Sequence, residues 1–224
     1  MRISSMDIDA VSFDVDGTLY SQKAAVFRLL PELYAERRLL KAYELERERM
    51  RGKPGLGDLR RVAAGRAART CGMSEDEACG TVERLVFRRW NEVLRPSDVF
   101  PGVRKLLVRL LAGGVKIAAI SDYPVEGKLR SLGLDSFTWA TCMSCEDVGS
   151  LKPAPDVFTA AASRLGVVPS RVLHIGDRED CDVAGAHAAG MKSAFYARGI
   201  RKIRYLVRGS RAEIVFSDYT KFPV

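Results

Sequence analysis

The chain has 224 residues, which suits one large domain or a core with one modest insertion. Hydrophobic residues make up 47% of it and charged residues 29%, so it can bury a core, and a mainly disordered chain is excluded. The net charge of +8 suggests nucleic acid as a partner, but the excess is spread along the chain and is highest in residues 21–98.

The apolar stretches are too short for a membrane span. A run such as 106–111 is interrupted by Arg109 and falls far short of the roughly 18 residues that a span needs. Residues 1–9 carry Asp7 and Asp9 and no apolar run typical of a signal peptide. Five cysteines, an odd number, do not suggest a disulfide scaffold. We expect a soluble, cytoplasmic protein with reduced thiols and no membrane partner.

The first predicted element is a buried strand over residues 10–14, which ends in the sequence Asp-Val-Asp-Gly. No strand-like run occurs from residue 22 to about residue 98. Apolar residues recur there at steps of three and four, which is helical spacing, as in Leu29, Leu30 and Leu33. Residues 21–98 are therefore predicted to be a helical insertion, broken near residues 52–57.

After Pro101 the pattern alternates between helix and strand. Helices are expected at 103–111, 128–132, 156–165 and 182–189. Strands are expected at 115–120, 137–142, 172–175 and 193–196, with a last one within 212–219. Such alternation predicts an α/β fold with a doubly wound parallel sheet, a Rossmann-like core with right-handed crossovers. Residues 1–20 and 99–224 would form this core, and residues 21–98 would be inserted into it.

Polar residues follow four of the predicted strands, at the edge where such sheets bind ligands. In chain order they are Asp14, Asp16, Ser121, Asp122, Lys152, Asp177 and Asp182. Three or four carboxylates within a few ångströms cannot all ionise without a cation, and Lys152 alone compensates too little. Hard oxygen ligands favour Mg²⁺ over zinc or copper. We therefore predict a magnesium site formed by Asp14, Asp16, Asp177 and Asp182.

In their order and spacing these residues resemble the four motifs of the haloacid dehalogenase superfamily. The matching segments are Asp14-Val-Asp16-Gly-Thr18-Leu, Ser121, Lys152-Pro-x-Pro-x-x-Phe158 and Gly176-Asp177 with Asp182 five residues on. The resemblance covers about residues 9–19 and 101–196. The insertion resembles the family's mobile helical cap in length and position alone.

The resemblance implies phosphoryl-transfer chemistry on the first motif. Asp14 would be the nucleophile that forms an aspartyl phosphate, which divides one difficult displacement into two easier ones. Asp16 would protonate the leaving alcohol and then activate water, with its backbone carbonyl on the metal. Thr18 would support Asp16 or the phosphate. The presence of Asp16 argues against a dehalogenase, because dehalogenases of this family lack the second aspartate.

The resemblance assigns binding roles to the other motifs. Ser121 would hold the phosphoryl oxygens together with backbone N–H groups, and Lys152 would neutralise charge on the nucleophile and the phosphate. Asp177 would be a direct Mg²⁺ ligand, and Asp182 would act through water or by orienting the groups that bind the ion. An alternative for Asp182 that does not depend on the resemblance is that it caps the helix that follows it.

Two positions depart from the family's pattern. Cys181 and Asp122 both stand where relatives commonly have asparagine. A further carboxylate near a phosphate is repulsive, so Asp122 either points away or meets a hydrophilic or cationic part of the substrate or of the cap.

The basic segment 47–61 has two interpretations. It is either a solvated helix face with weak local ion pairs, or a loop that brings Arg51 and Lys53 to an anionic substrate. We include Asp122, Arg51 and Lys53, with Ser121 and Lys152, among the candidate substrate-binding residues.

We predict a Mg²⁺-dependent phosphatase that hydrolyses a small phosphorylated metabolite. A sugar phosphomutase of the same superfamily stays open, because it would use the same aspartates. A nucleic-acid-binding module is disfavoured, since we find no sustained acid-free basic run and no stacking motif in the sequence. Cys142 and Cys145 have C-x-x-C spacing but no second pair to complete a metal site, and His174 is expected to be a packed core residue.

Overall fold

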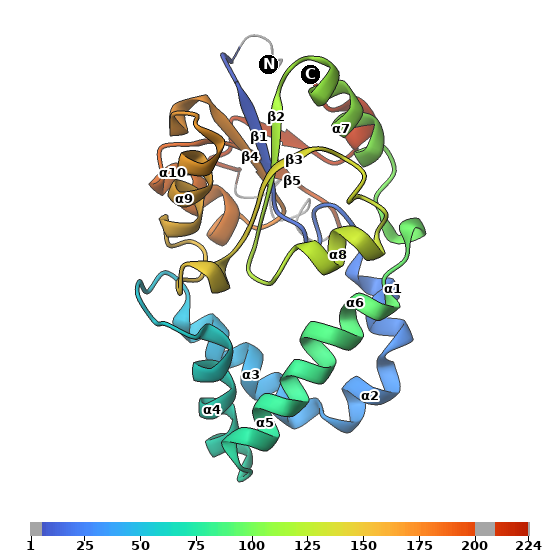
Figure 1. Ribbon diagram of the computed structural model, residues 1–224, viewed down its shortest axis with the longest axis vertical. Coiled ribbons are helices and arrows are strands. Elements are labelled where there is room, and N and C mark those ends of the chain that lie inside the picture. Colours follow the sequence, from blue (N-terminus) through green and yellow to red (C-terminus); the bar gives the residue numbers. More distant parts are fainter. Residues whose placement is uncertain (1–5, 200–208, 224) are drawn as a thin grey trace.

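The parallel sheet is the centre of the molecule (Figure 1). The computed structural model describes residues 6–199 and 209–223, and within them the strand order is β3-β2-β1-β4-β5-β6. All neighbouring strands run parallel. The strands are β1 (Ala10–Phe13), β2 (Lys116–Ser121), β3 (Trp139–Ser144), β4 (Val172–Gly176), β5 (Lys192–Tyr196) and β6 (Ile214–Phe216). The predicted doubly wound α/β fold is confirmed, although β3 begins and ends two residues later than predicted.

Helices cover both faces of the sheet (Figure 1). They are α7 (Val103–Ala112), α8 (Glu126–Ser131), α9 (Asp156–Leu165) and α10 (Ala184–Ala188). All four residues of β1 are buried, as expected for a strand covered on both sides. One apolar cluster joins Val11 and Phe13 to Leu106 and Leu110 of α7, and a second joins Ala10 to residues of α9.

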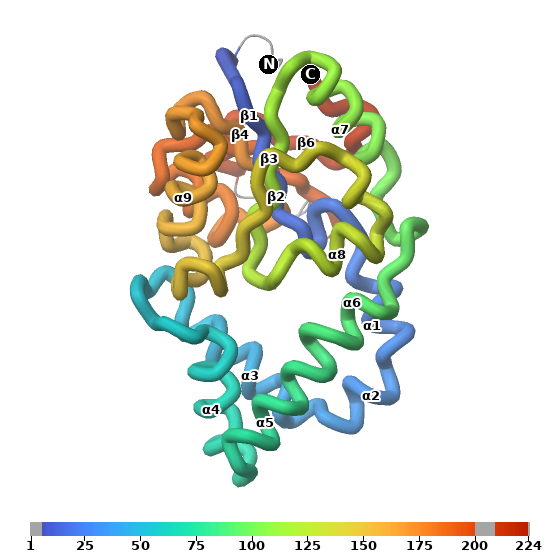
Figure 2. Tube along the Cα trace, in the orientation of Figure 1, coloured from blue at the N-terminus to red at the C-terminus, as the bar shows by residue number. Residues whose placement is uncertain are grey.

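The segment between β1 and α7 is helical, as predicted. Its helices are α1 (Gln22–Arg28), α2 (Leu30–Ala35), α3 (Arg37–Met50), α4 (Leu59–Cys71), α5 (Glu75–Val82), a π-helical stretch (Glu83–Arg89) and α6 (Trp90–Val93). Ser74 accepts a hydrogen bond from the Glu77 N–H (3.2 Å) and so caps α5. Figure 2 shows this helical insertion, residues 21–98, as a group of helices beyond the carboxyl ends of the strands.

Shorter helical turns complete the described chain. They are the 3₁₀ turns Pro96–Asp98, Cys145–Asp147, Pro169–Arg171 and Tyr219–Lys221, and a π-helical segment Glu179–Val183 that precedes α10. The last helix therefore begins earlier than the predicted residue 182. None of the described helices has the length and apolarity that crossing a bilayer requires.

Links between the helical insertion and the core include an ion pair and a set of backbone hydrogen bonds. Arg28 forms a two-pronged ion pair with Asp98, at 2.6 and 2.9 Å, where the chain leaves and re-enters the core. The loop 52–57 hydrogen-bonds to residues 149–151, from the Gly52 N–H to the Leu151 carbonyl (3.2 Å) and from the Leu56 N–H to the Gly149 carbonyl (2.9 Å).

Candidate active site

A buried ammonium group joins two of the predicted aspartates at the carboxyl ends of the central strands. Lys152 Nζ donates to Asp14 Oδ1 (3.0 Å), to Asp182 Oδ1 (2.8 Å) and to the Ile120 carbonyl (2.9 Å). The Lys152 side chain is 2% exposed. The structure thus brings together residues that follow β1, β3 and β4, because the ends of parallel strands meet at one edge of a sheet.

Three carboxylates converge beside this lysine. One oxygen from each of Asp14, Asp177 and Asp182 lies within 4.8 Å of the others, and all three residues are buried. Gly17 makes room for Asp177, since its φ is +90° and a Cβ there would lie 2.5 Å from Asp177 Oδ2. We call Asp14, Lys152, Asp177 and Asp182 the inner floor.

The inner floor is short of positive charge. Burial raises the pKa of Asp14 well above its ordinary value; Lys152 offsets this in part, and the carboxylates of Asp182, Asp177 and Asp16 reinforce it. Burial would lower the pKa of Lys152, but Asp14 and Asp182 hold it well above its ordinary value, so the ammonium stays charged. One ammonium beside three buried carboxylates is a donor set that fits a hard divalent cation such as Mg²⁺.

Asp182 is held from two sides. Its Oδ2 accepts from the Arg178 N–H (3.0 Å), and His174 Nε2 lies 3.4 Å from its Oδ1. Burial would raise the pKa of Asp182, but Lys152 and His174 lower it. His174 is buried in β4 and its Nδ1 is 2.9 Å from Ser12 Oγ, so it is a core residue that also positions Asp182.

Asp16 is surrounded by hydrogen-bond donors. The Tyr20 hydroxyl and the Lys128 ammonium each contact one of its oxygens, and Ser121 Oγ donates to it at 3.2 Å. Trp90 Nε1, from the helical insertion, donates to the Tyr20 hydroxyl at 2.7 Å. Tyr20, Lys128 and Trp90 were not predicted to belong to the site. Their nearest sequence signals are that Tyr20 directly follows the first motif and that Lys128 lies on the helix after Ser121.

Thr18, which was predicted to support Asp16 or the phosphate, makes no side-chain hydrogen bond to Asp16. Its Oγ1 is buried and has no hydrogen-bond partner among the described residues. Its backbone carbonyl accepts from the Tyr219 hydroxyl at 2.8 Å. After the turn at Gly17 (φ +90°) the chain enters the core, and Thr18 is fully buried there. The hydrogen bonds to Asp16 therefore come from other residues.

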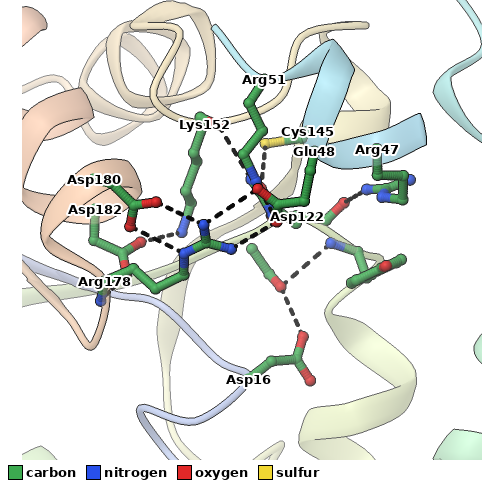
Figure 3. A network of polar contacts seen from close by, with 12 residues as sticks. Asp16, Arg47, Glu48, Arg51, Asp122, Cys145, Lys152, Arg178, Asp180 and Asp182 are labelled. Carbon is green, nitrogen blue, oxygen red and sulfur yellow. Dashed lines mark hydrogen bonds and ion pairs between the residues drawn. The ribbon is translucent and has the colours of Figure 1, made fainter. Parts of the chain in front are cut away.

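A cavity of about 330 Å³, the main cavity, opens over the inner floor. Its far side, which we call the outer wall, is built from Glu48 and Arg51 of the helical insertion and Asp122 and Arg178 of the core. Figure 3 shows how these side chains meet. Arg51 pairs with Asp122 at 2.7 Å and with Glu48 at 2.9 Å. Arg178 pairs with Glu48 at 3.0 Å and with Asp180 at 2.7 Å.

Asp122 meets a cation of the helical insertion, which was one of the alternatives for this unusual carboxylate. Burial would raise its pKa, but Arg51, Lys152 and Arg47 lower it, so it is ionised. Arg47 donates to the Asp122 carbonyl (2.8 Å) and pairs with Glu146 (2.8 Å) with its side chain 1% exposed. This part of the basic segment is therefore a buried ion-pair network and not a solvated helix face.

Lys53 is a correction to the predicted substrate-binding set. It is exposed and lies outside the residues that line the main cavity, whereas Arg51 lines it. The physical reason is the loop 52–57, which pairs its backbone with residues 149–151 instead of dipping into the cavity. The Gly55 N–H also donates to Ser150 Oγ at 3.1 Å.

The cysteines carry no metal site in the part of the chain that the structure describes. All five thiols are free, and the cluster with metal-binding spacing consists of the three aspartates. Cys145 Sγ donates to Asp122 Oδ1 at 3.4 Å. Cys181 lines the main cavity, and burial raises the pKa of its thiol to about 12, so it is protonated at neutral pH.

The aspartates gather beside β1 and β4, where the strand order reverses, which is the binding position of doubly wound sheets. Fold and site together define an α/β protein whose candidate reactive group is a carboxylate. The family model of the haloacid dehalogenase-like hydrolases matches residues 8–190. The chain belongs to this family, as the four motifs predicted.

Relatives with assigned names support the same family. A glyceraldehyde 3-phosphate phosphatase from Methanopyrus kandleri is 39% identical over 103 residues, which are 45% of this chain and 44% of that protein. A phosphoglycolate phosphatase from Rhodospirillum rubrum is 29% identical over 94% of this chain and 87% of its own. The chain thus spans about half the length of the first of these relatives. A β-phosphoglucomutase from Clostridium difficile shares the fold, with a TM-score of 0.66, 17% identity and coverage of 96% of this chain and 92% of its own.

Proposed function

We propose that the protein is a Mg²⁺-dependent phosphatase that hydrolyses a small phosphorylated metabolite through an aspartyl phosphate on Asp14. The observation that carries the proposal is the buried Lys152, which bridges Asp14 and Asp182. Asp16 lies two residues after Asp14 in the chain. The two relatives named as phosphatases support the same reaction class.

Asp14 is the proposed nucleophile. Lys152 holds its Oδ1 at 3.0 Å, which leaves the other carboxylate oxygen to attack phosphorus. The new bond joins that oxygen to phosphorus, and the bond from phosphorus to the leaving alcohol breaks. Water then attacks phosphorus, phosphate leaves and Asp14 is regenerated.

Asp16 is the proposed general acid and base. It gives a proton to the departing alcohol and takes one from the attacking water. Ser121, Tyr20 and Lys128 hold its carboxylate in place. These three donors come from different elements, so the orientation of Asp16 is set by the packing of the site and not by its own turn.

Asp14, Asp177 and Asp182 would hold the Mg²⁺ ion, together with the backbone carbonyl of Asp16. When bound, the ion supplies the positive charge that the inner floor lacks and neutralises phosphoryl oxygens. The raised pKa of Asp14 supports this assignment, because an ionised nucleophile needs that charge.

The proposal also divides the chain into two domains. Residues 1–20 and 99–224 would form the catalytic core, and residues 21–98 the cap. It is supported by the main cavity, whose floor comes from the core and whose outer wall takes Glu48 and Arg51 from the helical insertion.

The test is a panel of phosphorylated sugars, nucleotides and short-chain acids, assayed with Mg²⁺ for both free phosphate and isomers. We expect free phosphate, loss of activity in excess chelator, recovery with Mg²⁺ and poor recovery with Ca²⁺, whose shell is larger and looser. An isomer without free phosphate would establish the phosphomutase instead, and full turnover in chelator would exclude the metal assignment.

A further inference from the structure

A second, mostly apolar cavity adjoins the main one. It has a volume of about 200 Å³. We call this cavity the apolar chamber. Its apolar lining comes from the helical insertion and consists of Leu33, Leu40, Leu85, Val86 and Trp90. The two cavities share four lining residues, Asp16, Gln22, Glu44 and Tyr123.

Asp16 sets the direction in which a leaving group would extend. In the proposed function its carboxylate contacts the oxygen that departs from phosphorus, and Asp16 lies on the border of both cavities. The inner floor, where the phosphoryl group would react, lines the main cavity alone. The group attached to the departing oxygen therefore has the apolar chamber as its neighbour.

The cations around the main cavity are already paired. Among the described residues, each lysine or arginine that lines it has a carboxylate partner: Arg51 has Asp122, Arg178 has Asp180, and Lys152 has the aspartates of the inner floor. Lys128, which borders the apolar chamber, pairs with Asp16.

Glu44 adds a carboxylate between the two cavities, where its oxygen accepts from the Tyr123 hydroxyl at 2.9 Å. A second anionic group on the substrate would have to break an ion pair to find a cation, and it would face Glu44 as well.

From the adjoining chamber and the paired cations, we propose that the substrate is a phosphomonoester whose alcohol carries an uncharged, apolar group about the size of a benzene ring, seated in the apolar chamber. This inference rests on the proposed function and names its substrate class. An apolar cavity of about 150 Å³ already accepts benzene, so about 200 Å³ provides the room. A carboxylate-bearing alcohol such as glycolate fits neither the chamber nor the charges.

The test compares three phosphomonoesters of primary alcohols with Mg²⁺: benzyl phosphate, methyl phosphate and 2-phosphoglycolate. We expect kcat/KM for benzyl phosphate to exceed that for 2-phosphoglycolate at least tenfold, because even one methylene group in an apolar pocket discriminates by about 10- to 200-fold. Equal or better turnover of 2-phosphoglycolate overturns the inference and leaves the phosphatase intact. No phosphate from these esters or from any compound of the panel described above overturns the proposed function.

A variant of the chamber tests its location. Leu40→Trp fills it, and Leu45→Trp is the matched control on the same helix, at a residue that is half exposed and lines neither cavity. We expect Leu40→Trp to lower the ratio of kcat/KM for benzyl over methyl phosphate about tenfold, and Leu45→Trp to leave it within about twofold. An unchanged ratio in Leu40→Trp refutes the chamber as the leaving-group site.

Two measurements keep the test decisive if Leu40→Trp fails to fold. Val86→Phe narrows the same chamber from a different helix, with the same expected fall in the ratio. Binding calorimetry of the wild type with benzylphosphonate and phosphonoacetate measures the preference without turnover. Tighter binding of phosphonoacetate would refute the inference even if both variants behaved as expected.

Discussion

The inner floor and the outer wall of the main cavity are both networks of charged side chains, but the inner floor is buried, the outer wall is partly exposed, and they are built in different ways. The inner floor is held by residues that follow strands of one sheet, with Lys152 bonded to two aspartates. The outer wall joins α3 of the helical insertion to loops of the core, as in the pair between Arg51 and Asp122. The inner floor can keep its shape if the insertion moves, whereas the outer wall exists only while insertion and core are in contact.

This difference separates two tasks. A group that reacts has to be positioned within a fraction of an ångström, which adjacent strand ends achieve through a shared hydrogen-bond ladder. A group that selects a substrate has to close around it, which residues from two parts of the chain achieve. Substitutions in the inner floor should therefore remove chemistry, and substitutions in the outer wall and its supports should change stability or affinity.

The largest expected effect is on the inner floor. Asp14→Asn should lower kcat about 10³-fold or more, because it removes the attacking oxygen and keeps the shape of the side chain. Phosphate release measures the rate, and acid quenching should trap a phosphoenzyme in the wild type that is absent from the variant. Unfolding temperature is the control, which should not fall. Retention of more than about a tenth of the rate would mean that water attacks directly.

A stability test addresses the support of the outer wall. Arg47→Met should lower the free energy of unfolding by about 3 kcal/mol, because it leaves the partly buried Glu146 without its cation. Arg49→Met is the matched control two residues away, where the side chain is 60% exposed and pairs with Glu46, and it should cost at most about 1 kcal/mol. Urea denaturation measures both. Equal losses of unfolding free energy in the two variants would show that burial of the ion pair does not matter for stability.

The connection between insertion and core gives a pH-dependent prediction. Burial would raise the pKa of Asp98, but its bonds to Arg28 and to the Arg95 N–H lower it. Asp98→Asn should therefore cost about 2 kcal/mol at pH 7. Since the folded pKa lies below the unfolded value, this contribution is complete above about pH 4 and is lost as the pH falls through the folded pKa. Urea denaturation at pH 7 and at pH 3 measures the difference in free energy of unfolding between wild type and variant, which should shrink in acid. A difference that grew at pH 3 would contradict the prediction.

The smallest effects concern the loop after α3. Arg51→Ala should lower kcat/KM about tenfold for every phosphomonoester, because the ionised Asp122 would face the phosphate without its partner. Lys53→Ala should change kcat/KM less than about twofold, since Lys53 is exposed and lies outside the cavity. Steady-state kinetics on one substrate compares them. A larger loss in Lys53→Ala would restore this lysine to the binding set.

The alternation of helices and strands and the position of the aspartates could be predicted from the sequence because both depend on local patterns. A short apolar strand that ends in Asp14 or Asp177 identifies its own carboxyl end, and parallel strands bring such ends to one edge. The gathering of Asp14, Lys152, Asp177 and Asp182 follows from that rule.

The outer wall could not be predicted because its partners are far apart in the chain. Arg47 and Glu146 are separated by 99 positions, and their contact depends on how the helical insertion packs on the core. A helix rich in both arginine and glutamate offers many local partners, so sequence spacing gave no reason to prefer a distant one. The same holds for Lys128, whose contact with Asp16 depends on the start of α8 at Glu126.

The hydrogen bond from Trp90 to Tyr20 places a fluorescent side chain next to the candidate active site. The chain has two tryptophans, and Trp139 lies in the edge strand β3, where its Nε1 donates to the Leu134 carbonyl at 2.8 Å. Trp139→Phe would leave Trp90 as the single tryptophan, on the helical insertion and two hydrogen bonds from Asp16, and excitation near the red edge of its absorption avoids the tyrosines. Its emission would then follow the contact between the insertion and the proposed acid during each turnover, without any added label.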